Sequence, residues 1–190
     1  MSKLRVGFAM CGSFCTFSQA LRQLKRLTEE DVELIPIMSP VACSTDTRFG
    51  KAEEIVEQVE TLCGRQIIRT IAQAEPIGPK KLLDMIVVAP CTGNTMGKLA
   101  NGITDTCVTM AVKAHLRNGR PVLLAPATND ALAACGKNIG ILLNTRNIFF
   151  VPMEQDDPQG KPTSLVCKFD LLIPAMYAAL EGEQIQPVIR

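Results

Sequence analysis

Short apolar runs alternate with longer amphipathic stretches along most of the chain. Continuous apolar runs of this length are typical of strands that are buried on both faces of a parallel sheet. They predict strands at residues 4–10, 32–38, 84–89, 121–125 and 148–151. The second run contains Pro36, which lacks the N–H that a central strand would use, so we place this strand at an edge of the sheet.

Between the strands, apolar residues recur at the spacing of an α-helix. The pattern predicts helices at residues 17–27, 49–62, 94–100, 103–116, 131–143 and 164–180. Thr16 and Gln19 have the spacing of a capping box for the first helix, with Ser13 as an alternative cap. Gly64 is expected to end the second helix. Residues 65–80 fit either an extended segment or a turn imposed by proline and glycine.

Strands that alternate with helices predict an α/β fold, with a parallel sheet of five or six strands in a three-layer αβα sandwich. The edge position of the second strand favours the flavodoxin-like order 2-1-3-4-5 over the longer Rossmann-like order of dinucleotide-binding proteins. We expect a single domain over residues 1–182 and a loose C-terminal tail at 183–190.

Composition narrows the class of protein. The 190 residues are 47% hydrophobic, which is enough for one buried core without metals or disulfides. A net charge of +1 and 4% aromatic residues argue against a nucleic-acid partner. The chain has no apolar run of membrane-spanning length, and residues 1–5 lead into a strand without a signal-peptide pattern, so we expect a cytoplasmic protein that does not contact a membrane.

Cysteine and histidine usage gives no metal site. The chain has eight cysteines without a CxxC pair and one histidine, so we predict that most cysteines are buried, reduced thiols. His115 lies between Lys113 and Arg117 and is predicted to be a surface residue. Asp105 is expected to stabilise the start of a helix, and Cys167 to have a structural role.

Three unusual turns follow the first, third and fourth strands, which are neighbours in the predicted order. They contain Gly12-Ser13, the segment 90–95 (PCTGNT) and the segment 126–129 (PATN). The carboxyl ends of neighbouring parallel strands lie at one edge of the sheet, so these turns should converge on one crevice. The sequence therefore predicts a binding site there.

The chemistry of the three turns suits an uncharged heterocycle that carries a phosphate. Gly12 allows close approach of the backbone, and Ser13 adds a hydroxyl beside helix N–H groups, although an ordinary strand-to-helix turn has the same composition. Thr92, Asn94 and Thr95 can hydrogen-bond a ring edge, cap the following helix, or do both. For Thr128 and Asn129, helix capping and binding are likewise both open.

The segments 90–95 and 126–129 resemble the flavin-binding PA(S/T)ANT and PAMN motifs of the homo-oligomeric flavin-containing cysteine decarboxylases. The resemblance extends from Val6 to about Val151. It implies an FMN site in which Gly12 and Ser13 hold the phosphate and the two motifs surround the ring. By position, the motif residues are Pro90, Thr92, Asn94, Thr95, Pro126, Thr128 and Asn129.

Within this superfamily, the segments 7–17 and 88–95 are most similar to one branch. Its members are B subunits of a synthase that forms pyridine-2,6-dicarboxylate in spore-forming bacteria. This implies an oxidoreductase-type reaction on a tetrahydropyridine precursor, in the mother cell of the sporulating bacterium. The implied partner is an A subunit that carries NADP or NAD, and the chain itself is expected to form trimers or dodecamers.

Two departures from the decarboxylases leave alternatives open. The histidine that they carry before the third strand is absent, and Glu75-Pro76-Ile77-Gly78 lies nearby instead. Their late flap, rich in glycine and cysteine, is not reproduced either. A flavin-dependent decarboxylase or flavin prenyltransferase is the second interpretation, and a non-catalytic scaffold subunit with a vestigial flavin site is the third. No catalytic residue is assigned from the sequence.

Overall fold

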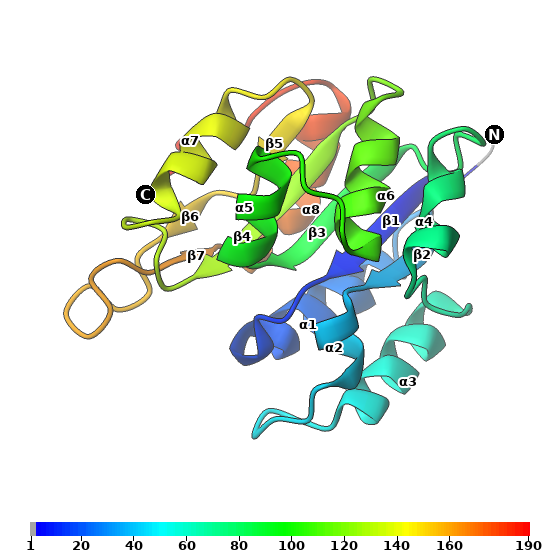
Figure 1. The fold of residues 1–190 in the computed structure, drawn as a ribbon, viewed down its shortest axis with the longest axis horizontal. Helices are drawn as coiled ribbons and strands as arrows, with labels where there is room; N and C mark the ends of the chain where they lie inside the picture. Colours follow the sequence, from blue (N-terminus) through cyan, green and yellow to red (C-terminus); the bar gives the residue numbers. More distant parts are fainter. Residues whose placement is uncertain (1–2) are drawn as a thin grey trace.

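The computed structural model describes residues 3–190 as a central sheet between two layers of helices (Figure 1). The strands are β1 (Leu4–Met10), β2 (Val32–Met38), β3 (Met85–Cys91), β4 (Val122–Thr128), β5 (Ile148–Phe150), β6 (Met153–Glu154) and β7 (Leu165–Cys167). The helices are α1 (Phe17–Leu27), α2 (Pro40–Ser44), α3 (Ala52–Cys63), α4 (Ile71–Ala74), α5 (Gly93–Ala100), α6 (Cys107–Leu116), α7 (Gly136–Leu143) and α8 (Leu172–Leu180). Short 3-10 turns precede α1 and α8 and follow α4.

Five strands form a parallel sheet in the order β2-β1-β3-β4-β5, which confirms the predicted strand order. β2 lies on the outside, as Pro36 required. Ile68 makes a single bridge to the outer side of this strand, where its N–H donates to the Pro36 carbonyl at 2.9 Å and its carbonyl accepts from Met38 N at 3.1 Å. The nitrogen of Pro36 therefore faces away from β1, where no ladder hydrogen bond is lost.

The sheet as a whole has seven strands and is mixed, whereas five or six parallel strands were predicted. The difference lies at the side of the sheet away from β2. β4 continues past its pairing with β5, and its last residues, Ala127 and Thr128, pair antiparallel with β7. β6 then pairs antiparallel with β7. These strands of two and three residues are too short to leave a periodic pattern, and the helix expected from residue 164 begins only at Leu172.

The sheet is buried on both faces. Val6, Phe8 and Met10 of β1 pack into one core with α1, α3 and α8, while Ala9 faces the other core with α5, α6 and α7. In Figure 1, α5 and α6 lie in front of the strands and α8 lies behind them. This confirms the three-layer arrangement, and it leaves the carboxyl ends of β1, β3 and β4 as the place where loops meet.

Besides α8, three helices begin later than their apolar stripes predicted. α3 starts at residue 52 instead of 49, α6 at 107 instead of 103, and α7 at 136 instead of 131. For α6 the reason is a capping box in which Thr106 and Thr109 each bond the other's backbone N–H. Gly64 ends α3 with a left-handed φ of 64°, as predicted.

The C-terminal residues pack against the sheet, at odds with the loose tail expected there. The Gln184 side chain accepts from Phe150 N at 2.7 Å and donates to Phe150 O at 2.8 Å. Ile189 forms a bridge with Met153. Within residues 3–190, none of the helices combines the length and the hydropathy needed to cross a bilayer.

Candidate functional site

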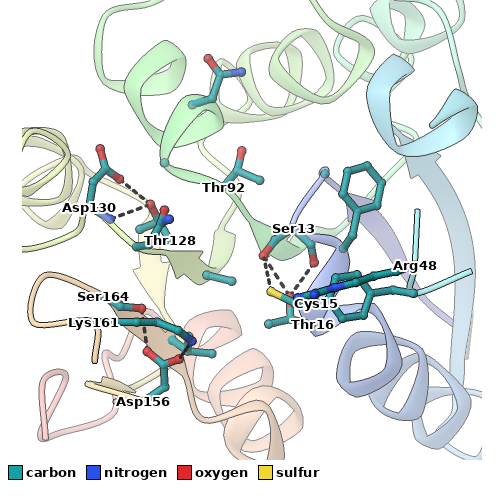
Figure 2. A pocket seen from close by; sticks show the side chains of 18 residues that line it. Ser13, Cys15, Thr16, Arg48, Thr92, Thr128, Asp130, Asp156, Lys161 and Ser164 are labelled. Carbon is teal, nitrogen blue, oxygen red and sulfur yellow. Dashed lines mark hydrogen bonds and ion pairs between the residues drawn. The ribbon is translucent and has the colours of Figure 1, made fainter. Parts of the chain in front are cut away.

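The turns after β1, β3 and β4 meet around a pocket of about 670 Å³, within the roughly 300–1,000 Å³ of small-molecule sites (Figure 2). The convergence predicted from the strand order is thus observed. Six of the nine predicted residues line this pocket: Gly12, Ser13, Thr92, Asn94, Thr128 and Asn129. Pro90, Thr95 and Pro126 do not, because they are buried beneath the turns.

The turn after β1 leaves helix N–H groups without a side-chain acceptor. The Thr16 hydroxyl donates backwards to the Ser13 carbonyl at 2.9 Å and lies 3.2 Å from Ser13 Oγ (Figure 2). Neither the predicted capping box with Gln19 nor the alternative cap by Ser13 is formed, so both expectations are wrong. Uncapped N–H groups at a helix start are free to bind an anion.

Gly12 gives this turn its tight packing. A Cβ at this position would lie 3.1 Å from Val41 Cγ1, closer than an ordinary van der Waals contact. The backbone therefore approaches α2 and the pocket without a side chain between them. Ser13 and Thr16 then present the hydroxyl groups on this side of the pocket.

The turn after β3 combines capping with exposure to the pocket. Thr95 N donates to Thr92 Oγ1 at 3.1 Å, and the two hydroxyl oxygens lie 2.9 Å apart. Thr92 is therefore the cap of α5, which confirms one of the two roles considered, and it also lines the pocket. Asn94, in the first turn of α5, is exposed, so its amide is available to a ligand.

The turn after β4 caps no helix, so the capping interpretation of Thr128 and Asn129 is wrong. Thr128 Oγ1 donates to Asp130 Oδ1 at 2.5 Å, and the Asn129 carbonyl accepts from Thr163 Oγ1 at 2.6 Å. A Cβ on Gly93 would lie 2.6 Å from Thr128 Oγ1 and 2.8 Å from Asp130 Oδ1. The turns after β3 and β4 thus touch at Gly93, which must have no side chain.

The charged residues of the pocket were not predicted from the sequence. They are Arg48, Asp130, Asp156 and Lys161, with the hydroxyl of Ser164 beside them. No motif marks them, because they come from loops with irregular structure. One signal in the sequence could have located Asp156 and Lys161. Both follow β5, and the loop after a parallel strand begins at the carboxyl edge of the sheet.

Asp156 lies at the centre of a small network on one wall of the pocket (Figure 2). Ser164 Oγ donates to Asp156 Oδ1 at 2.6 Å, and Lys161 Nζ lies 2.9 Å from Oδ2. The Ser164 hydrogen bond, more than the Lys161 ammonium, holds the pKa of Asp156 below its usual value. Across the pocket, the Arg48 guanidinium stacks over the Phe49 ring at 4.8 Å.

The cysteines are free thiols, and five of the eight are buried, as predicted for most of them. Burial raises the pKa of the Cys11 thiol to about 11, and it also raises the pKa of Cys167, which is buried on β7 as a structural residue. Cys15 is exposed and lines the pocket. Between residues 3 and 190, no group of three or more His, Cys, Asp or Glu side chains is arranged to hold a metal ion.

Two further expectations are wrong. His115 is fully buried because it continues the apolar stripe of Val108, Ala111 and Val112 along α6. Its Nε2 lies 3.1 Å from the Pro121 carbonyl oxygen. Asp105 lies before the cap of α6 and pairs with Lys98 at 2.9 Å instead of stabilising the helix start. Neither residue lines the pocket.

Comparison with known proteins agrees with this geometry. The family model described as Flavoprotein matches residues 1–177. The chain belongs to the Flavoprotein family. This Flavoprotein-family chain is 48% identical over 185 residues to the B subunit of dipicolinate synthase from Bacillus subtilis (strain 168), an alignment that covers 97% of this chain and 92% of the relative. The predicted likeness to synthase B subunits is thereby confirmed.

Two solved structures have the same fold. The crystal structure of the dipicolinate synthase B subunit from Bacillus halodurans C matches with a TM-score of 0.90 at 43% identity, covering 100% of this chain and 98% of that chain. A dodecameric FMN-dependent UbiX-like decarboxylase from Escherichia coli O157:H7 matches with a TM-score of 0.65 at 23% identity, covering 78% and 80%. At this identity the second match shows the fold alone.

Proposed function

We propose that this chain is the B subunit of a dipicolinate synthase. In this role it takes part in forming dipicolinate from a tetrahydrodipicolinate-type precursor in the cytoplasm of a sporulating mother cell. The observation that carries the proposal is the 48% identity to a B subunit over nearly the whole length of both chains. A pocket at the carboxyl edge of the sheet, where α/β proteins bind ligands, supports it.

We assign this pocket to FMN. The uncapped N–H groups after Gly12 and the hydroxyls of Ser13 and Thr16 fit a phosphate, and the nearby Arg48 adds positive charge. The residues that would line the ring are Thr92, Asn94, Thr128 and Asn129, supported from beneath by Pro90, Thr95 and Pro126. Bound FMN would supply an acceptor for hydride.

The residues of the chain would bind and orient the precursor, while a nicotinamide-dependent A subunit works with them. The chain's one histidine, His115, is buried and does not line the pocket, so a histidine-dependent decarboxylation has no acid–base group there. This favours the synthase over the decarboxylase alternative. A homo-oligomer, trimeric or dodecameric, is part of the proposal, because the FMN-dependent relative is dodecameric.

A titration of the apoprotein with three flavins tests the cofactor assignment. We expect FMN to bind more tightly than riboflavin, which lacks the phosphate, and more tightly than FAD, whose second nucleotide half has no evident site. Quenching of flavin fluorescence gives the three affinities. Absence of binding at high micromolar FMN would disprove the cofactor assignment.

Mixing experiments test the partnership. The chain alone, loaded with FMN, should form little dipicolinate from the precursor, and addition of the A subunit with NADP or NAD should give multiple turnovers. The reason is that aromatisation needs a hydride acceptor that can be regenerated. Equal activity of the A subunit with and without this chain would show that the chain is a bystander in the reaction.

A further inference from the structure

We infer that Asp130 is the acid–base residue of the pocket, the group that takes up and returns a proton on the precursor ring. The inference rests on the proposed function, because it assigns a role within the same pocket. Asp130 directly follows the Thr128-Asn129 turn, and it belongs to neither of the flavin-motif segments. It lines the pocket opposite the Arg48 side (Figure 2).

Asp130 is held in place by both its side chain and its main chain. Its Oδ1 accepts from Thr128 Oγ1 at 2.5 Å, and its carbonyl oxygen accepts from Ala133 N at 3.0 Å and Cys135 N at 3.1 Å. Thr128 is in turn fixed because it ends β4 and pairs with Leu165 of β7. A carboxylate held this way has the fixed geometry that proton transfer needs.

The contact with Gly93 points to the same role. Asp130 Oδ1 can lie where it does only because Gly93 has no Cβ, since a Cβ there would lie 2.8 Å from this oxygen. Asp130 therefore lies against the first residue of α5, beside the Thr92 and Asn94 groups that we assign to the flavin ring. A precursor bound against the flavin ring would place its own ring beside this carboxylate.

The other carboxylate of the pocket is already engaged. Asp156 is bound by Lys161 at 2.9 Å and by the Ser164 hydroxyl at 2.6 Å, and this network holds its proton affinity low. By contrast, none of the ion pairs formed among residues 3–190 includes Asp130. Of the two, Asp130 is the carboxylate without a cationic partner among these residues, so no cation competes with a ligand for it.

The proposed step is the loss of water from a hydroxylated tetrahydropyridine dicarboxylate. A ring C–H bond breaks, its electron pair becomes a ring double bond, and the hydroxyl group leaves from the neighbouring carbon. Asp130 takes the ring proton and returns it to the departing hydroxide, so that water leaves and the carboxylate is restored. The two further hydrogens would be removed afterwards, as a hydride and a proton, in the separate oxidation for which the proposed function supplies the hydride acceptor.

This role predicts that a dicarboxylate binds together with a proton. A dicarboxylate bound beside Asp130 would disfavour the ionised form of the Asp130 carboxyl. Binding of dipicolinate should therefore be accompanied by uptake of about one proton by Asp130. The other charged or titratable groups that face the same space or pack behind Asp130 are Arg48, Asp156, Lys161, Cys15 and Cys135.

The test uses the FMN-loaded protein and dipicolinate itself as the probe. Calorimetric titration in two buffers of different protonation heat gives the number of protons taken up. The wild type should take up about one proton and Asp130→Asn close to none. In the two-subunit reaction, Asp130→Asn should lower kcat by about 100-fold or more, with FMN affinity within about threefold of wild type.

Matched variants separate this role from a structural one. Asp31→Asn removes a carboxylate at an exposed surface position, where the side chain is 88% accessible, and should change neither readout. Thr128→Val keeps the Asp130 carboxylate but removes its hydrogen bond, so it should lower kcat by about tenfold and retain proton uptake. It serves as the second test if Asp130→Asn melts at a much lower temperature.

The outcomes are distinguishable from a failure of the proposed function. If the wild type binds neither FMN nor dipicolinate, both proposals are wrong. If it binds both and supports turnover, but Asp130→Asn keeps the proton uptake and the kcat of wild type, only the inference about Asp130 is overturned. Binding by the wild type without proton uptake also contradicts it.

Discussion

The two ends of the central sheet use their polar groups in different ways. At the amino end, Asp84 bonds Arg5 Nη2 at 2.8 Å and Arg5 Nε at 3.0 Å, and Arg120 Nη1 lies 2.9 Å from the same carboxylate. His115 bonds the Pro121 carbonyl close by. At the carboxyl end, the three turns present hydroxyl and amide groups around an open pocket.

The difference separates groups that stabilise the fold from groups that can meet a ligand. The Arg5 hydrogen bond holds the pKa of Asp84 below its usual value, so this carboxylate is committed to its arginines over the pH range in which proteins work. The carboxyl end uses its hydrogen-bonding groups in short local contacts that leave room for a ligand. Substitutions at the two ends should therefore change different measurements.

The largest effect is expected at the amino end, from acid. Burial lowers the pKa of His115 to about 4, against 6.5 for an unperturbed histidine. As pH falls from 7 to 4, the unfolded chain takes up a proton that the folded chain does not, so the free energy of unfolding should fall by on the order of 3 kcal/mol.

Denaturant titrations at several pH values measure this loss. His115→Gln cannot titrate but keeps a donor for the Pro121 carbonyl, so its stability should depend less on pH over this range. An unchanged slope in His115→Gln would show that carboxylates, and not His115, cause the acid sensitivity.

At the carboxyl end, Gly93→Ala should distort the pocket. The new Cβ would meet Thr128 Oγ1 at 2.6 Å and push apart the turns after β3 and β4. We expect FMN affinity to fall by about 30–100-fold, equivalent to about 2–3 kcal/mol, which a fluorescence titration would show.

Gly140→Ala is the matched control, because a Cβ at this position in α7 meets nothing within 4 Å. This variant should bind FMN like wild type and gain about 0.5–1 kcal/mol in helix stability. Equal FMN affinity in both alanine variants would contradict the assigned position of the flavin.

Asp84→Asn should reduce stability without affecting flavin binding. Two arginines lose their anionic partner in a site where the Asp84 side chain is 29% accessible, so we expect a loss of about 2 kcal/mol in denaturant unfolding. The exposed pair of Lys98 and Asp105 gives the comparison, since Asp105→Asn should cost at most about 0.5 kcal/mol. A loss of FMN binding in Asp84→Asn with its fold intact would show that the two ends are coupled.

The smallest effect is expected from Asn94→Ala. Its amide is exposed at the pocket, so the variant should lose about 0.5–1.5 kcal/mol of FMN binding energy while its melting temperature stays near that of wild type. A lower melting temperature with unchanged affinity would make Asn94 a residue of α5 stability only.

The parts of the fold that depend on local pattern could be predicted from the sequence. The apolar runs gave the five parallel strands, and Pro36 placed β2 at the edge, which in turn gave the order that brings three turns together. β6 and β7 could not be predicted, because their pairing joins residues far apart in the chain and their length leaves no pattern.

For the site, the sequence located the turns but not the charges around them. Motif residues such as Ser13 and Thr92 lie directly after strand ends, so the strand order predicts their position. Arg48 and Lys161 lie in irregular loops, whose paths to the pocket the sequence pattern does not predict. His115 was misjudged because its neighbours in sequence are basic. Its neighbours one and two helical turns earlier, Ala111 and Val108, are apolar and pointed inward.

The Gln184 side chain has a consequence for the behaviour of the protein at high concentration. Its amide bonds both the N–H and the carbonyl of Phe150, two of the groups that β5 would otherwise offer to a strand of another molecule. An unpaired strand edge is a template for aggregation. The Gln184 amide occupies the position that the peptide group of a neighbouring strand would take. At Phe150 it therefore blocks the pairing of β5 with a sheet of another molecule.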